Sequence, residues 1–198
     1  YGLNNDALAD LAGQGIKVVL TVDCGIRSVN EVAYGNSLGL DLIITDHHTV
    51  GDEIPPALAA INPKQPDCPY PFEELAGVGL AYKLAQALWQ ALAPAGDRRQ
   101  GIHPSDFLDL VAVGTVADLA PLYGENRTLV KQGLQQLNQS LRPGLKALMA
   151  QSGSKSNTIS TETIGFVIGP RLNAAGRLDS ALAAYHLLMT QNEAEAAP

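Results

Sequence analysis

The sequence lacks the features of secreted, disulfide-stabilised and membrane proteins. Its two cysteines, Cys24 and Cys68, are far apart and have no second pair beside them, which indicates reduced thiols in the cytoplasm rather than a zinc site or a disulfide framework. No apolar run reaches the roughly 20 residues of a membrane-spanning helix, and the first residues do not form a signal peptide. Because the chain begins without methionine, we expect it to be an excised piece of a longer protein.

Aromatic residues and positive charge are also scarce. Aromatic side chains make up 5% of the chain, so single-strand binding by base stacking would need platforms from elsewhere. The net charge of −7 argues against a protein that coats nucleic acid generally, and leaves room only for a local basic groove or a separate basic domain. With 46% hydrophobic residues over 198 positions, the chain can bury the core of one domain or slightly more.

The first half of the chain alternates between helical and strand-like patterns. Its apolar segments are short and continuous, which favours buried strands of a parallel sheet that helices cover on both faces. Ser28 and Glu31 predict a capping box at the start of the second helix. The expected elements are a helix at 4–12, a strand at 17–22, a helix at 28–38, and strands at 40–45 and 57–61.

The pattern changes after residue 62. Prolines exclude a helix across residues 63–72, which we expect to cross the surface as a loop. Helical spacing dominates the remainder, and Gly169 and Pro170 predict a break in it. Helices are expected at residues 79–92, 105–119, 126–139, 143–149, 162–168 and 179–189. The predicted fold class is therefore α/β, with a parallel sheet flanked by helices, followed by a helical segment.

Carboxylates and imidazoles follow the ends of separate apolar segments. Asp23 ends the strand at 17–22, Asp46, His47 and His48 follow the next strand, and Asp118 closes a third apolar run. Open α/β folds place their chemistry at the carboxyl edge of the sheet, where such residues would meet. Alone, each is more simply a turn cap, a local hydrogen-bonding group or a surface acid. Together they favour a site for Mg²⁺ or Mn²⁺ in a hydrolase.

Four motifs occur in an order that makes this interpretation more specific. They are Val22-Asp23-Cys24-Gly25, Thr45-Asp46-His47-His48, Gly114-Thr115-Val116-Ala117-Asp118 and Gly169-Pro170-Arg171-Leu172-Asn173-Ala174-Ala175-Gly176-Arg177-Leu178. With Asn62-Pro63-Lys64, Leu75 to Gly79 and Gly124 to Arg127, they resemble the DHH phosphoesterase superfamily and, within it, the RecJ-type single-strand-specific exonucleases. The last of the four motifs separates RecJ-like members from the pyrophosphatases of the superfamily.

The resemblance implies a role for each site residue. Asp23 would bridge two ions, Mn²⁺ or Mg²⁺, and His47 and Asp118 would be ligands of one of them. His48 would donate to the scissile phosphate or to the leaving group, and Asp46 would orient the imidazoles. The implied reaction is attack of a metal-bound hydroxide on the phosphodiester phosphorus.

The resemblance also indicates what the chain lacks. Members carry an earlier strand with an Asp-x-Asp-Ala-Asp-Gly type motif that supplies further ligands, and nothing before Asp23 matches it. We therefore expect residues 1–198 alone to bind Mn²⁺ weakly, to hydrolyse little and to expose a sheet edge. The expected domains are a DHH α/β domain without its first strand (1–150), a polar mobile linker (151–160) and a helical connector to an absent C-terminal domain (161–198).

A second group of candidates would bind nucleic acid. Arg171, Asn173 and Arg177 belong to a stretch that borders the nucleic-acid channel in RecJ-like proteins, and arginine binds phosphate through its planar fork. An ion pair such as Arg177 with Asp179 is the alternative. Arg27, close to Asp23, would either contact phosphate or neutralise the acidic site.

Gly77-Val78-Gly79 could form a phosphate loop, although tight packing between helix and sheet is the simpler interpretation.

The predicted function is part of a metal-dependent 5′→3′ exonuclease of DNA repair and recombination. Its partners would be single-stranded DNA and, as a candidate, a single-strand-binding protein, and the chain would be monomeric. The alternatives are another DHH phosphoesterase, acting on short oligonucleotides, cyclic dinucleotides or pyrophosphate, and a decayed scaffold that serves as a repair or replication partner.

Overall fold

The computed structural model describes residues 2–92, 103–139, 141–153, 158–178 and 181–196, except the side chains of 175–178. The chain divides into two compact units, residues 1–97 and residues 98–198. The first unit contains a parallel sheet with helices, and the described residues of the second are helical. The predicted fold class is confirmed. The domain boundaries predicted at residues 150 and 160 stay predictions.

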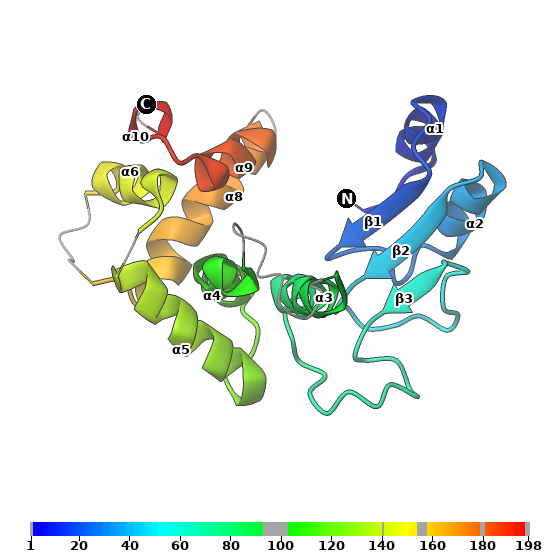
Figure 1. The fold of residues 1–198 in the computed structure, drawn as a ribbon, viewed down its shortest axis with the longest axis horizontal. Coiled ribbons are helices and arrows are strands. Elements are labelled where there is room, and N and C mark those ends of the chain that lie inside the picture. Colours follow the sequence, from blue (N-terminus) through cyan, green and yellow to red (C-terminus); the bar gives the residue numbers. More distant parts are fainter. Residues whose placement is uncertain (1, 93–102, 140, 154–157, 179–180, 197–198) are drawn as a thin grey trace. The chain divides into compact units, whose positions relative to one another are not determined.

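The sheet of the first unit brings the ends of its strands level with one another. It consists of β1 (Val18–Val22), β2 (Asp41–Thr45) and β3 (Ala59–Ile61), all parallel and in that order (Figure 1). In the register, the last residue of β1 is level with the last residue of β2, which is level with the last residue of β3. Residues that follow β1 and β2 therefore emerge at the same edge.

Two helices cover one face of this sheet. The helices α1 (Asn5–Gly13) and α2 (Val29–Ser37) pack on alternate residues of β2. The Asn4 side chain caps α1 by accepting a hydrogen bond of 2.8 Å from the Ala7 N–H, as such residues commonly do at an N-cap. The third helix, α3 (Gly77–Leu92), begins near the carboxyl ends of the strands (Figure 1). The core between α1, α2 and the sheet contains Leu8, Val32, Leu40, Leu42 and Ile44.

The opposite face of β1 is open in this unit. Val18, Leu20 and Val22 are 55%, 47% and 49% exposed, which departs from the expectation of a sheet covered on both faces. These residues alternate along β1 and so share one face. As β1 is at the edge of the described sheet, the expected exposed edge is present.

The capping box predicted at α2 is wrong. Ser28 is the N-cap residue, but its side chain makes no capping hydrogen bond. Its backbone has φ −89° and ψ 54°, outside the extended region that an N-cap residue normally adopts. The reason is a turn, in which the Ser28 N–H donates to the Gly25 carbonyl at 2.9 Å.

The second unit is a bundle of helices around its own core. Gly133 permits the close packing of α4 (Leu108–Ala117) and α5 (Gly124–Gln139), because a Cβ there would lie 2.2 Å from the Leu108 carbonyl oxygen. The elements are η1 (Pro104–Phe107), α4 (Leu108–Ala117), α5 (Gly124–Gln139), α6 (Pro143–Gln151), α7 (Thr161–Thr163), η2 (Ile164–Ile168), α8 (Gly169–Leu178), α9 (Ala181–Met189) and α10 (Glu193–Ala196). Buried members of the core include Ala112, Val113, Val116, Val130, Leu137, Leu145, Leu148, Ile159, Ile164 and Ile168.

Two details of this unit differ from the sequence-based expectation. Gly169 and Pro170 do not interrupt the helix, because a π turn, η2, leads directly into α8. Pro170 directly follows the π turn, in which the Gly169 N–H donates to the Ile164 carbonyl five residues earlier. The end of the predicted linker is held in place: Ile159 is buried, its N–H donates to Asn138 Oδ1 at 2.8 Å, and its carbonyl accepts from Asn138 Nδ2 at 2.9 Å. Residues 154–157 of that linker lie outside the described residues.

Candidate metal centre

Three of the predicted site residues meet at the carboxyl edge of the sheet. The metal-capable atoms of Asp23, His47 and His48 all lie within 4.8 Å of one another. Asp23 Oδ1 and His47 Nε2 are 3.0 Å apart. Adjacent ligands of an octahedral ion with bonds of about 2.1 Å are also separated by about 3 Å. The carboxylate and imidazole are therefore spaced as two neighbouring ligands of one divalent cation, and this donor pair fits Mn²⁺ or Mg²⁺.

Asp23 occupies an unusual backbone conformation. Its φ is +68°, in the left-handed region that non-glycine residues rarely adopt. The Asp23 N–H still donates to the Thr45 carbonyl at 2.9 Å, so the residue is fixed to β2 while the chain turns away from the sheet. Strained residues of this kind concentrate at functional sites, where the surrounding structure holds them.

The Asp23 carboxylate packs directly against Gly77, which has no side chain in the space that the carboxylate occupies. A Cβ at Gly77 would lie 2.2 Å from Asp23 Oδ1 and 2.7 Å from Asp23 Cγ. The carboxylate thus rests directly against the first residue of α3, where the helix dipole favours negative charge. This close approach is the tight helix–sheet packing that the Gly77-Val78-Gly79 motif was expected to provide.

The Asp46 carboxylate is buried and accepts several hydrogen bonds. The residue is 2% exposed. Its Oδ2 accepts from the Ile26 N–H at 3.0 Å, and its Oδ1 accepts from the N–H groups of His47 and His48 at 2.8 and 3.2 Å. His48 Nδ1 lies 2.6 Å from the same oxygen. Burial alone would raise the pKa of Asp46, but the hydrogen bonds from Ile26 and His48 outweigh it and lower that pKa. Asp46 is therefore a carboxylate whose oxygens orient the histidine loop, residues 47–51.

The two histidines differ in exposure. The His47 side chain is 13% exposed and faces Asp23, whereas the His48 side chain is 58% exposed. Their ring centroids are 4.6 Å apart. With Nδ1 of His48 bound to Asp46, its Nε2 is the ring nitrogen left for a ligand, as in other carboxylate–histidine pairs.

Sequence reasoning assigned no role to Asn62, which supports this loop. Asn62 is 2% exposed, and its Nδ2 donates to the His48 carbonyl at 2.9 Å. Its Oδ1 accepts from the Lys64 N–H at 2.8 Å, so the end of β3 is tied to the histidine loop. Asn62 belongs to a motif that was noted in the sequence, but its function depends on an approach that a single sequence does not reveal.

Cys24 adjoins the cluster without the character of a reactive thiolate. Burial first, and then the carboxylates of Asp46 and Asp23, raise the pKa of the Cys24 thiol. The thiol is therefore protonated at neutral pH. Its carbonyl accepts a hydrogen bond of 2.7 Å from Thr21 Oγ1, which helps to fix the turn after β1.

Asp118 belongs to the second unit. It is the C-cap residue of α4, and its N–H donates to the Gly114 carbonyl at 2.9 Å. The following residue, Leu119, has φ +58° and is 88% exposed. Because Asp118 and the Asp23–His47 pair lie in separately described units, its role as a ligand stays a prediction.

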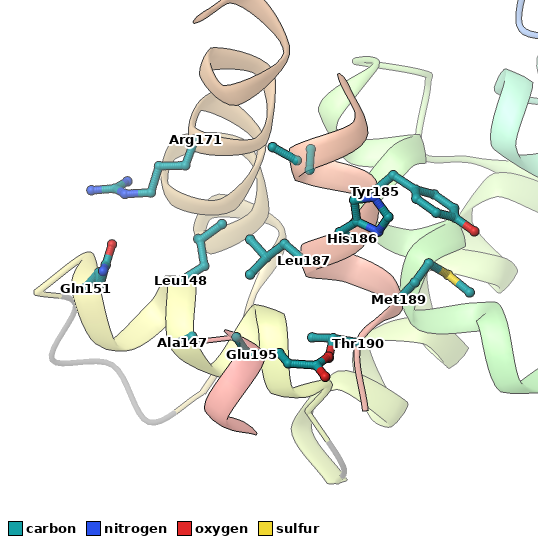
Figure 2. Close-up of a pocket in the computed structure, with 13 residues that line it drawn as sticks. Ala147, Leu148, Gln151, Arg171, Tyr185, His186, Leu187, Met189, Thr190 and Glu195 are labelled. Carbon is teal, nitrogen blue, oxygen red and sulfur yellow. The ribbon is translucent and has the colours of Figure 1, made fainter. Parts of the chain in front are cut away.

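The predicted nucleic-acid residues lie on α8. Arg171 and Asn173 are exposed, and Arg171 Nη1 donates to the Val167 carbonyl at 3.0 Å. Arg171 also lines a cavity of about 830 Å³ with residues of α6, α9 and α10, and projects from α8 on the side of Gln151 (Figure 2). The side chain of Arg177 and the whole of Asp179 lie outside the described residues, so the alternative ion pair stays open.

A search of the helices within the described residues finds none with the length and apolar character needed to cross a membrane.

Comparisons with known proteins agree with the geometry. The single-stranded-DNA-specific exonuclease RecJ of Bacillus subtilis is 46% identical over 196 residues, covering 99% of this chain and 24% of the relative. RecJ of Escherichia coli is 42% identical over 201 residues, covering 99% of this chain and 35% of the relative. The chain thus spans about a quarter to a third of the curated relatives it matches.

Solved structures of relatives share the fold and contain divalent ions. A structure of exonuclease RecJ bound to manganese is 37% identical, with a TM-score of 0.80 over 99% of this chain and 47% of that one. RecJ of Thermus thermophilus in complex with Mn²⁺ is 36% identical, with a TM-score of 0.79 over 98% of this chain and 28% of that one. The family model described as "DHH family, N-terminal domain" matches residues 3–115, more than half of the sequence. The chain therefore belongs to the DHH family.

Proposed function

We infer that this chain is part of a metal-dependent exonuclease that degrades single-stranded DNA in the 5′→3′ direction during repair and recombination. The observation that carries this inference is the 3.0 Å approach of Asp23 Oδ1 to His47 Nε2 at the carboxyl edge of the sheet. The similarity to RecJ over nearly the whole chain supports the choice of substrate. Polarity rests on that similarity alone.

Asp23 and His47 would hold the divalent ion, and Asp118 would be a further ligand. We assign Asp23 to the bridging position of a two-ion site, because its carboxylate offers two oxygens and is 52% exposed. When bound, such ions supply a hydroxide nucleophile and stabilise charge on the phosphate. The remaining ligands would come from an acidic motif outside this chain, so residues 1–198 alone should bind Mn²⁺ weakly and hydrolyse little.

Asp46 and His48 would act as a pair beside the metal. The Asp46 carboxylate fixes His48 through Nδ1 at 2.6 Å, which leaves Nε2 as the ring nitrogen that can face the substrate. A protonated Nε2 would donate to the scissile phosphate or to the leaving oxygen. Asp46 would position this group without touching the substrate.

The DNA backbone would contact Arg171, Asn173 and Arg177 on α8. Arg171 supports this assignment because its side chain is exposed and donates to the Val167 carbonyl through Nη1. The other guanidinium nitrogens could then bind phosphate. A single-strand-binding protein is the candidate partner. The chain would be a monomer, and a place in the cytoplasm accords with the two free cysteines, Cys24 and Cys68.

The test is hydrolysis by the full-length protein that contains this chain, in Mn²⁺. Single-stranded DNA labelled at the 5′ or 3′ end is compared with duplex DNA, dinucleotides, cyclic dinucleotides and pyrophosphate, with Asp23→Asn as the inactive control. We expect mononucleotide release from the 5′ end of single strands and its loss in the variant. Faster hydrolysis of dinucleotides, cyclic dinucleotides or pyrophosphate would indicate another class of DHH phosphoesterase. Hydrolysis of none of the substrates would favour a scaffold without catalytic activity.

A further inference from the structure

Arg27, at the carboxyl edge of the sheet, has a fixed position that the metal centre does not explain. Arg27 lies in the turn after β1, four residues beyond Asp23, and is exposed. Its neighbour Ile26 is buried and donates its N–H to Asp46 Oδ2 at 3.0 Å. The backbone of this turn is therefore fixed to the histidine loop.

The Arg27 side chain is tethered to the same loop. Its Nε donates to the Thr49 carbonyl at 2.8 Å, and Thr49 directly follows His48. A Cβ at Gly51 would lie 3.9 Å from Arg27 Cγ, so the stem of the arginine runs along this loop. One of the five guanidinium N–H groups is used, and four remain on the two terminal nitrogens.

The arginine does not neutralise the acids of the site. Within the part of the chain that the structure describes, no carboxylate is within ion-pair distance of the Arg27 guanidinium, whose one hydrogen bond goes to Thr49. Asp46 already accepts from Ile26, His47 and His48. Of the two alternatives for Arg27, phosphate contact is the one that the geometry favours.

We propose that Arg27 forms a phosphate subsite, binding non-bridging oxygens of a phosphodiester next to the scissile one. This inference rests on the proposed function. The tether at Nε orients the terminal nitrogens, so less freedom is lost when they bind phosphate bidentately. In a chain of net charge −7, such a local cation offsets part of the repulsion on the strand.

The test uses the full-length protein in EDTA, where cleavage does not occur, and a fluorescent single-stranded oligonucleotide whose binding is followed by anisotropy. Arg27→Met is compared with Lys17→Met. Lys17 is also exposed, but it precedes β1 at the opposite end of the sheet. Both variants remove one positive charge from the surface of the first unit, at different positions. Arg27→Lys keeps the charge and loses the planar fork.

Arg27→Met should weaken binding by about tenfold and make the negative slope of log K against log salt shallower by about 0.7, the change for one lost contact with a single strand. Lys17→Met should change affinity by less than about twofold, and Arg27→Lys should retain most of the salt slope. Equal affinities and slopes for Arg27→Met and Lys17→Met would overturn the subsite while leaving the nuclease intact. If the wild-type protein neither binds nor hydrolyses single-stranded DNA, the proposed function and the subsite are both overturned.

Discussion

Replacement of Gly77 by alanine tests how the metal centre is assembled. The new Cβ would lie 2.2 Å from Asp23 Oδ1 and 2.8 Å from Asp23 Cβ. Ordinary contact requires about 3.4 Å, so the carboxylate or the start of α3 must move by roughly 1 Å. Asp23 cannot yield easily, because its N–H is bound to Thr45 and its φ is already +68°. A shift of this size separates the carboxylate from His47 Nε2.

We expect Gly77→Ala to lower Mn²⁺ affinity by about 10- to 100-fold, the range seen when groups that orient metal ligands are lost. Calorimetric titration of the full-length protein with Mn²⁺ measures this change, and circular dichroism checks the fold. Gly79→Ala is the matched control, since it also adds a methyl group within α3. The nearest atoms to its Cβ belong to the Leu75 side chain, with Cδ2 at 3.1 Å, so its Mn²⁺ affinity should stay within about threefold of wild type. Equal Mn²⁺ affinities for the two folded variants would refute the reasoning.

Two further comparisons separate roles within the site and within the second unit. His47→Ala should lower Mn²⁺ affinity by about 10- to 100-fold. His48→Ala should lower kcat by about 10²- to 10⁴-fold and leave Mn²⁺ affinity unchanged. The reverse pattern would exchange the roles of the two histidines. Arg142→Met should destabilise the second unit by about 3–5 kcal/mol, because Asp109 is 1% exposed and loses its ion pair. Urea unfolding measures this loss, and Lys146→Met, which removes an exposed ion pair, should leave the midpoint unchanged. Equal midpoints for these two variants would contradict the assigned role of Arg142.

The sequence was sufficient to predict the edge where the site forms. Apolar strands that end in Asp23 and in Asp46 must place those residues together once the strands are parallel and in level register. The meeting of Asp23 with His47 follows from that rule. The same logic did not identify Asn62, and it gave Gly77 a packing role without its contact to Asp23, because α3 and the end of β3 reach the site through tertiary packing.

The helical half was harder to predict for local reasons. Glycine followed by proline at residues 169 and 170 normally ends a helix, but the π turn before it lets the axis continue. Ser28, in the first unit, shows the same kind of departure: it has the residue type of an N-cap, but the turn to Gly25 rotates its backbone away from the capping geometry. In both places tertiary context overrides a sound local preference.

The most direct measurement is a crystal structure of the full-length protein with Mn²⁺, using anomalous scattering to locate the ion. A peak bonded at about 2.2 Å to both Asp23 Oδ1 and His47 Nε2 is the predicted result. Manganese bound to only one of these atoms, or bound elsewhere in a folded and active enzyme, would contradict the central claim.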